Sequence, residues 1–165
     1  MLQLEHIGIA VSNLSTSVPL FEKLLNSQCY KKENVESEKV TTAFFKTGDC
    51  KIELLESTDP DGVITKFIAK RGEGIHHLAF EVKDISAEIK RLEDEGYILM
   101  SKEPKIGADN KLVVFLHPKS TGGVLIELVQ EIDSADGRRQ AANGRSLIII
   151  RRFLQSFVNQ AFRGR

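Results

Sequence analysis

Residues 4–11 have the sequence L-E-H-I-G-I-A-V, and residues 75–82 repeat its pattern as I-H-H-L-A-F-E-V. In both segments apolar side chains alternate with small or polar ones, which is typical of a strand with one buried face. A histidine stands at the same place in each segment, His6 in the first and His77 in the second. Gly8 and Ala10 share a face with His6, and such small neighbours leave room above the sheet. We therefore expect His6 to point into a hollow.

The likeness between the two halves extends beyond these strands. The shift that places His6 on His77 also places Asn13 on Asp84, and both residues are good N-caps for a helix. A slightly longer shift places I-E-L at 52–54 on I-E-L at 126–128. Self-similarity of this kind indicates duplication. We predict an α+β fold in which two tandem βαβββ modules close one curved mixed sheet.

The same patterns locate the elements of each module. Asn13 precedes a helix predicted at about 15–26, and Asp84 precedes one at about 86–95, for which Gly96 is a suitable C′ residue. Pro19 is compatible with the first helix only in its first turn or so, or as a kink. Further strands are predicted at 39–46, 50–55, 111–116 and 123–129, with a helical connector at 61–71. The predicted domain covers residues 1–130 and consists of modules 1–70 and 74–130.

Two glutamates complete a set of four ligand-type side chains. Glu53 and Glu127 each lie inside an apolar strand, where a carboxylate is costly unless it is paired or bound to a metal. With His6 and His77 they supply one imidazole and one carboxylate from each module. Enzymes commonly hold divalent metals with such a mixture. The alternative for Glu53 and Glu127 is a solvent-facing strand surface.

The other two histidines are weaker candidates. His76 points to the face opposite His77, so we expect it to be packed or hydrogen-bonded rather than a ligand. His117 precedes Pro118 in a predicted turn, where it would contact either substrate or solvent.

Composition excludes several classes of protein. The chain is 41% hydrophobic and 28% charged, as in an ordinary globular protein. We expect a cytoplasmic protein with reduced thiols, because Cys29 and Cys50 form no metal-ligand spacing and no signal peptide or transmembrane run is evident. Residues 1–130 carry a net charge of −4, which gives no reason to expect a nucleic-acid partner.

Residues 131–165 differ in composition from the rest of the chain. They contain seven arginines and no lysine, with a net charge of +4. The segment falls outside the repeat, and we interpret it as a non-native extension or a loosely attached basic tail. A peripheral helix that binds a membrane surface or a partner is the alternative.

Five segments resemble the methylmalonyl-CoA epimerases, a family of the vicinal-oxygen-chelate, or glyoxalase-like, superfamily. They are L-E-H-I-G-I-A-V, K-I-E-L-L-E, G-E-G-I-H-H-L-A-F-E-V, K-I-G-A and F-L-H-P-K-S-T-G-G-V-L-I-E-L. The resemblance covers about residues 2–130. It implies interconversion of (2R)- and (2S)-methylmalonyl-CoA by proton removal at C2 and reprotonation on the opposite face.

The resemblance also implies roles for residues of the site. His6, His77 and Glu127 would be metal ligands, and Glu53 takes the position of a Glu or Gln at or near the metal. A base that relatives place before the strand at Val40 aligns with Ser37, so we assign that role to the neighbouring Glu36, with Glu38 as its alternative. Glu127 would act on the other face, with Glu53 in reserve. Lys105 and Lys119 would contact the anionic coenzyme A portion.

Several possibilities stay open after this comparison. The metal could be Co, Mn, Ni, Zn or Mg, since all tolerate histidine and carboxylate ligands. A glyoxalase I-type lyase uses the same ligand set, two histidines and one carboxylate also bind iron in dioxygenases, and a metal-free binding module is a fourth reading. No membrane partner is expected, and we expect a homodimer because the sheet edges would benefit from pairing.

Overall fold

The computed structural model describes residues 2–132, which contain thirteen helical and strand elements. The helices are α1 (Leu14–Leu25), α2 (Val63–Arg71), α3 (Ile85–Asp94) and the short 3₁₀ helices η1 (Ala108–Asn110) and η2 (Pro118–Ser120). The strands are β1 (Gln3–Ala10), β2 (Lys31–Val35), β3 (Val40–Thr47), β4 (Cys50–Ser57), β5 (Gly74–Glu81), β6 (Lys105–Ile106), β7 (Lys111–Leu116) and β8 (Ile126–Glu131). None of the helices in this part of the chain is long and apolar enough to span a membrane.

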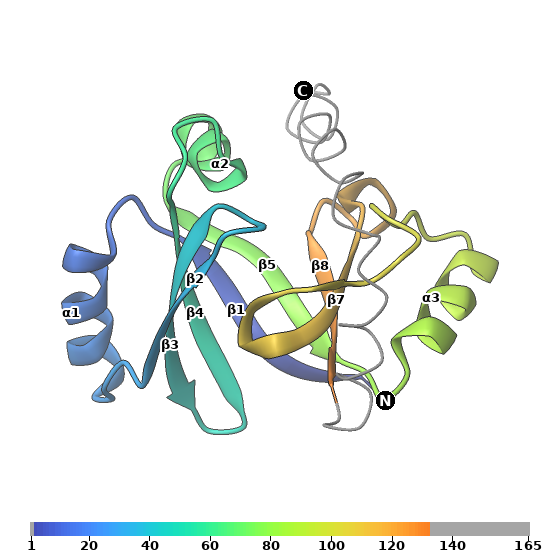
Figure 1. Ribbon diagram of the computed structural model, residues 1–165, viewed down its shortest axis with the longest axis horizontal. Helices are drawn as coiled ribbons and strands as arrows, with labels where there is room; N and C mark the ends of the chain where they lie inside the picture. Colours follow the sequence, from blue (N-terminus) through green and yellow to red (C-terminus); the bar gives the residue numbers. More distant parts are fainter. Residues whose placement is uncertain (1, 133–165) are drawn as a thin grey trace.

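All eight strands belong to one curled, mixed sheet (Figure 1). Their order is β2-β3-β4-β1-β5-β8-β7-β6. Each half of this order contains one parallel pair, β1 with β4 and β5 with β8, while the two halves join through the antiparallel pair β1 and β5. Equivalent strands of the two repeats therefore occupy equivalent places on either side of the joint, and the predicted α+β fold with duplicated βαβββ modules is confirmed.

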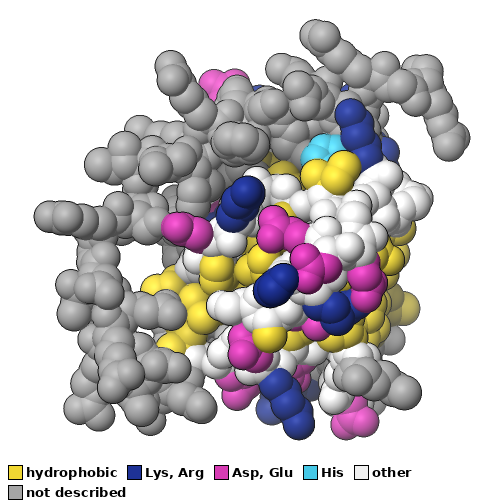
Figure 2. Space-filling model, turned by 90° about the vertical axis from the view of Figure 1, so that its right-hand side faces the viewer, with side chains coloured by type: hydrophobic (Ala, Val, Ile, Leu, Met, Phe, Trp, Pro, Cys, Tyr) yellow, Lys and Arg dark blue, Asp and Glu magenta, His cyan; other side chains and the backbone are white. Residues whose placement is uncertain are grey.

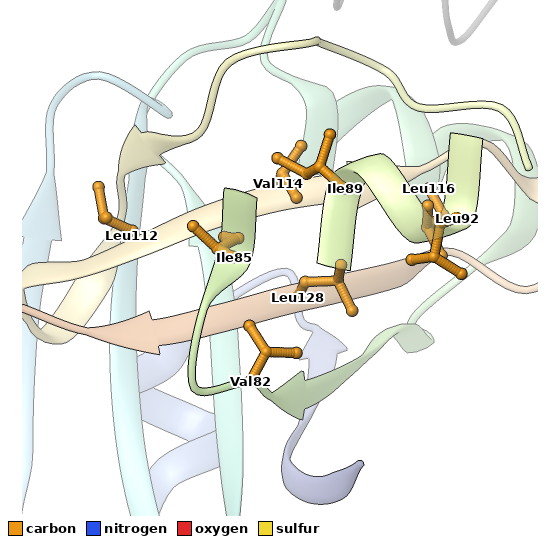
Figure 3. Packing of buried hydrophobic residues seen from close by; sticks show 8 residues of the cluster. All are labelled: Val82, Ile85, Ile89, Leu92, Leu112, Val114, Leu116 and Leu128. Carbon is orange, nitrogen blue, oxygen red and sulfur yellow. The ribbon is translucent and has the colours of Figure 1, made fainter. Parts of the chain in front are cut away.

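Two helices cover the outer face of the sheet, one in each half. Between α1 and the sheet lies a cluster in which Val18 of α1 joins Phe45 and Leu54 of the strands. Beneath α3 lies the equivalent cluster, shown in Figure 3, in which Ile85 and Ile89 pack against residues of β7 and β8 such as Leu128. Burial of these apolar side chains fixes which face of each strand is turned outward from the hollow of the sheet.

The outer surface of α3 is charged and exposed. Lys90 pairs with Asp94, and Arg91 pairs with Glu88 and Glu95. Figure 2 shows positive and negative side chains interspersed on this side of the molecule. The helix is therefore amphipathic, with its apolar stripe on the sheet and its ion pairs in solvent.

The helix N-caps follow the sequence prediction. Asn13 caps α1 by accepting a hydrogen bond from the backbone N–H of Ser15, and Asp84 caps α3 by accepting one from Ala87. Gly96 follows the C-cap of α3 with φ 86°, the left-handed conformation expected of a C′ glycine. Pro19 lies inside α1 beyond its first turn, and the helix continues through it.

Two strands were not located from the sequence pattern, although the βαβββ order requires them. They are β2 and β6, the outermost strands of the sheet. The predicted tail of residues 131–165 lies outside the described residues except for its first two. Of these, Glu131 is the last residue of β8 and pairs with Lys111 on β7, and Ile132 packs against the cluster beneath α3. The 1–130 domain and its module boundaries stay a prediction.

Candidate metal centre

The four ligand-type residues lie on the four central strands of the sheet: His6 on β1, Glu53 on β4, His77 on β5 and Glu127 on β8. Strand register brings them to one face. Gly8 on β1 lies opposite both Glu53 and His77, and Ala79 on β5 lies opposite both His6 and Glu127. Residues directly opposite each other across neighbouring strands share a face. All four side chains therefore point into the hollow of the sheet.

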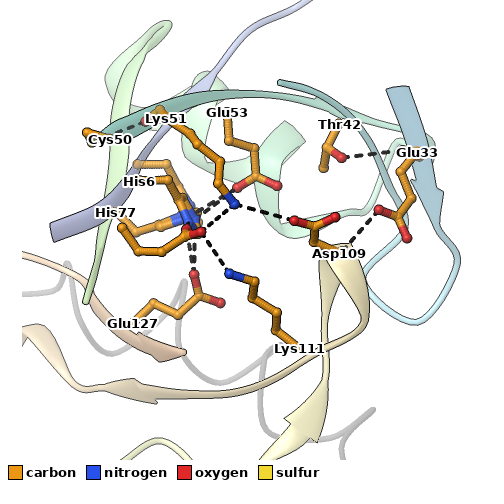
Figure 4. Close-up of polar contacts among 12 residues, drawn as sticks. His6, Glu33, Thr42, Cys50, Lys51, Glu53, His77, Asp109, Lys111 and Glu127 are labelled. Carbon is orange, nitrogen blue, oxygen red and sulfur yellow. Dashed lines mark hydrogen bonds and ion pairs between the residues drawn. The ribbon is translucent and has the colours of Figure 1, made fainter. Parts of the chain in front are cut away.

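The polar atoms of these residues converge on one point (Figure 4). Nε2 of His6 lies 2.9 Å from Nε2 of His77. Oε2 of Glu127 lies 3.2 Å and 3.4 Å from these two nitrogens, and Oε2 of Glu53 lies 3.3 Å and 3.5 Å from them. None of the four residues is more than 8% exposed. The structure thus brings together the four residues predicted to surround a metal.

Glycine at position 8 makes room for one of the rings. A Cβ built at Gly8 would overlap the imidazole of His77, with ring carbon and nitrogen atoms far inside van der Waals distance. Gly8, which shares a face with His6 on β1, thus lies directly beneath the imidazole of His77.

Outer partners hold each histidine from behind. Nδ1 of His6 donates to a carboxylate oxygen of Glu5, and Nδ1 of His77 lies 3.0 Å from Nδ1 of His76. His76 in turn stacks edge-on against Phe67, with 5.0 Å between the ring centroids. These partners fix the orientation of both rings, which is the usual role of groups around metal-binding histidines.

Glu5 was not among the residues singled out from the sequence. Strict alternation along β1 would turn Glu5 away from His6, but the pairing of β1 with β5 shifts register between Leu4 and His6. This irregularity lets Glu5 and His6 both be buried, at 7% and 8% exposure. The sequence of β1 does not reveal this register shift, because the shift arises from how β1 pairs with β5.

Two lysines, also missed, point toward the same place (Figure 4). Nζ of Lys111 lies 2.9 Å from Oε1 of Glu5, and Lys51 pairs with the same oxygen. Lys51 also lies 3.3 Å from Asp109. The clustered charges balance one another within the hollow.

The pKa shifts of His6 and Glu53 reflect close contact between imidazole and carboxylate groups. Burial alone lowers the pKa of His6, but hydrogen bonds to Glu127, Glu5 and Glu53 outweigh it and raise this pKa to about 12. Burial alone raises the pKa of Glu53, but hydrogen bonds to His6 and His77 outweigh it and lower this pKa to about 2. Without a cation, a proton on His6 therefore neutralises part of the carboxylate charge. His76 shows the opposite effect, since burial and the neighbouring His77 lower its pKa to about 3.

The donor set fits a divalent cation. His6, His77 and Glu127 each offer one ligand atom, and these atoms all lie within 4.8 Å of one another. Glu53 adds a fourth donor at similar distances. Imidazole nitrogen and carboxylate oxygen together suit Zn, Mn, Co or Ni, and carboxylate alone suits Mg. The family resemblance and this geometry point to the same kind of metal site.

The remaining candidates lie farther from the four. Glu36 is exposed in the turn between β2 and β3, and Lys119 is exposed in η2. Glu38 is half-buried and forms an ion pair with Lys105, whose Nζ lies 5.7 Å from the centroid of the Phe115 ring. Phe115 stacks edge-on against His77. The structure therefore places Lys105 near the site and leaves Glu36 and Lys119 at the surface.

Comparison with known proteins places this arrangement among related molecules. Residues 5–115 match the model of the glyoxalase/bleomycin resistance protein/dioxygenase superfamily. The mitochondrial methylmalonyl-CoA epimerase of Dictyostelium discoideum is 39% identical over 130 residues, which are 78% of this chain and 78% of that protein.

Solved structures are similar as well. The methylmalonyl-CoA epimerase of Mycobacterium tuberculosis superposes with a TM-score of 0.77 at 33% identity, over 81% of this chain and 91% of that one. A methylmalonyl-CoA epimerase in complex with methylmalonyl-CoA and NH4+ superposes with a TM-score of 0.75 at 34% identity, over 79% of this chain and 95% of the other. The likeness thus spans nearly all of the described residues.

Proposed function

Because this chain belongs to the glyoxalase/bleomycin resistance protein/dioxygenase superfamily, we propose that it is a methylmalonyl-CoA epimerase, an isomerase that inverts the configuration at C2 of methylmalonyl-CoA. The observation that carries this proposal is the convergence of two histidines and two glutamates, one of each from either repeat, in a buried hollow. Relatives with the same fold, at 33–39% identity, bear that activity in their names.

The chemistry requires stabilisation of negative charge. C2 lies between a thioester carbonyl and a carboxylate, so removal of its proton places charge on the thioester oxygen. A divalent cation held by His6, His77, Glu127 and Glu53 would supply Lewis-acid stabilisation of that charge. The native ion is one of Co, Mn, Ni, Zn and Mg. Ala79, Val113 and Val129 form a buried apolar cluster beside these four residues, and apolar neighbours strengthen electrostatic interactions in a site.

Inversion further requires two acid/base groups on opposite faces of the substrate. Glu53 and Glu127 approach the histidines from different strands and different repeats, and Figure 4 shows them on either side of the histidine nitrogens. We assign the two proton transfers to this pair. Glu36, the base favoured from the sequence, is exposed in the turn between β2 and β3, so Glu53, which was held in reserve, takes its place in this proposal.

The substrate is a coenzyme A thioester, in keeping with the methylmalonyl-CoA bound to a related epimerase. Lys105, beside the site, and Lys119, at the surface, are our candidates for contacts to its anionic groups. Assembly as a homodimer and a cytoplasmic location remain expectations from the sequence.

Isotope exchange tests the proposed activity directly. Metal-replete protein is incubated with methylmalonyl-CoA in deuterated water, with and without a chelator, and the deuterium at C2 is measured by mass spectrometry. We expect rapid incorporation that the chelator abolishes, above the slow uncatalysed rate of a blank. No incorporation by metal-replete protein would remove the epimerase proposal, and oxygen consumption without exchange would favour a dioxygenase.

A further inference from the structure

Glu5 is a buried carboxylate that the proposed chemistry does not use. Both of its oxygens are engaged, Oε2 by Nδ1 of His6 and Oε1 by the ammonium groups of Lys51 and Lys111. A carboxylate that is 7% exposed carries a large desolvation cost, even when it is paired. Replacement of such an ion pair by apolar side chains is often neutral or stabilising, so fold stability alone is a weak reason for this arrangement.

We propose that Glu5 is a positioning residue for the metal ligand His6. A carboxylate behind Nδ1 accepts the Nδ1–H and so keeps the neutral ring in the tautomer whose Nε2 lone pair faces the other three ligands. The same contact makes Nε2 a stronger donor to a cation. This inference rests on the proposed cation site.

The two lysines define how Glu5 does this. Lys111 is itself buried, at 8% exposure, and its Nζ lies 2.9 Å from Oε1 of Glu5. Lys51 contacts the same oxygen and continues to Asp109, which pairs with Lys31 at 2.8 Å. The lysines therefore hold one oxygen in place, and the other oxygen is left for His6.

The second histidine has a different partner. Nδ1 of His77 faces Nδ1 of His76, an imidazole rather than a carboxylate. One ligand of the site is thus backed by an anion and the other by a second ring. Loss of the Glu5 charge should therefore weaken cation binding by His6, while the position of the His77 ring should not change.

The first test compares three variants by isothermal titration of the metal-free protein with Mn²⁺. Glu5→Gln keeps the shape of the side chain and removes its charge. Lys111→Gln breaks the same buried ion pair but leaves Glu5 on His6, with Lys51 still in contact. Glu81→Gln alters an exposed glutamate on β5 and serves as the matched control.

We expect Glu5→Gln to weaken Mn²⁺ binding about 10- to 100-fold, as is typical when a partner of a ligating histidine is lost. Lys111→Gln should lower the melting temperature with a much smaller loss of affinity, and Glu81→Gln should change neither quantity. Equal Mn²⁺ affinity in Glu5→Gln and the unmodified protein would overturn the role of Glu5. Failure of the unmodified protein to bind Mn²⁺, Co²⁺ or Zn²⁺ at all would instead remove the cation site itself.

A second measurement needs no variant and so does not depend on Glu5→Gln folding. Long-range ¹H–¹⁵N NMR of the zinc-loaded protein reports which ring nitrogen of each histidine carries hydrogen. We expect Nδ1 of His6 to be protonated and Nε2 to be bound to zinc. A spectrum with Nε2 of His6 protonated and Nδ1 bound would contradict the proposal.

Discussion

The imidazole of His77 rests directly on the backbone of Gly8, in the space that a side chain at that position would fill. The contact crosses the joint between the two repeats, since Gly8 belongs to β1 and His77 to β5. The position of the His77 ring therefore depends on Gly8, which lies two residues after His6 on β1. This dependence gives the most direct test of the site's packing.

Gly8→Ala should displace the ring of His77. We expect a loss of stability of about 1–3 kcal/mol from overpacking and a fall in C2 exchange of about 100-fold from the misplaced ligand. The control is the double variant Gly8→Ala/His77→Ala, in which the ring is absent and the overlap is relieved. Thermal unfolding should show stability recovered in the double variant relative to Gly8→Ala, while exchange is abolished because the imidazole of His77 is absent. Two independent, additive losses of stability would mean that the two positions do not interact.

His77→Ala alone should abolish C2 exchange with little loss of folding. The substitution removes one of four ligand atoms, and the remaining side chains still close the hollow. Metal content by elemental analysis and circular dichroism would be measured together, with Glu81→Ala on the same strand as the control. Retained exchange in folded His77→Ala would contradict its assignment as a ligand.

Glu53→Gln and Glu127→Gln distinguish a ligand from a base. A base that serves one face should be required for exchange from one epimer only, so each variant should still exchange C2 hydrogen starting from the other epimer. Loss of the affected direction should be about 10²- to 10⁴-fold, the usual contribution of a positioned acid or base. The measurement is deuterium incorporation from each pure epimer separately. An equal loss from both epimers, with loss of bound metal, would show that the residue acts only as a ligand.

Metal binding should release protons. The pKa of His6 is raised from 6.5 to about 12 in the metal-free protein, so His6 is protonated at neutral pH and must lose that proton to bind a cation. Apparent Mn²⁺ affinity should therefore rise as pH increases through the neutral range. Titration calorimetry in buffers of different ionisation enthalpy counts the released protons, and affinity that is flat with pH would oppose the assignment.

Stability of the metal-free protein should show the complementary dependence. The raised pKa of His6 stabilises the fold fully below 6.5, and this contribution is lost as pH rises toward about 12. The lowered pKa of Glu53 stabilises it above 4.5, and this contribution is lost as pH falls toward about 2. The lowered pKa of His76 makes the fold less stable as pH falls from 6.5 toward about 3. Urea unfolding in the presence of a chelator should therefore give a maximum near pH 6.5, and added metal should move the maximum to higher pH.

Removal of residues 133–165 should leave C2 exchange and the melting temperature unchanged. The truncation keeps Glu131, which ends β8, and Ile132, which packs beneath α3. Both quantities would be compared in the full chain and the truncated chain at equal metal content. A collapse of activity in the shorter chain would show that the basic segment takes part in function.

The duplicated fold could be predicted because its signals are local. Asn13 and Asp84 cap helices through contacts within two or three residues, and the strands around His6 and His77 show clear alternation. The edge strand β2 has the sequence K-K-E-N-V, with charged residues on both faces. An edge strand tolerates or even favours such charges, so alternation of apolar residues is absent there.

The inner contacts of the site could be predicted only in part. His6, His77, Glu53 and Glu127 were found because each repeat provides the same pair. Glu5, Lys51 and Lys111 have no counterpart in that pattern, and they meet only because β1 shifts register against β5 and β7 returns to the hollow. Charge alone does not single out two lysines among many, so Lys105 and Lys119 were chosen on the family resemblance instead.

The central joint of the sheet has a consequence for the history of the molecule. Each repeat contributes one histidine and one glutamate, and the point where they meet lies beside the antiparallel pair β1 and β5. A half-length ancestor would hold only two of the four donors and would need a second copy of itself to complete the set. A single chain that carries both repeats keeps the four donors together at any protein concentration, and its two histidines have different outer partners, the carboxylate of Glu5 for His6 and the imidazole of His76 for His77.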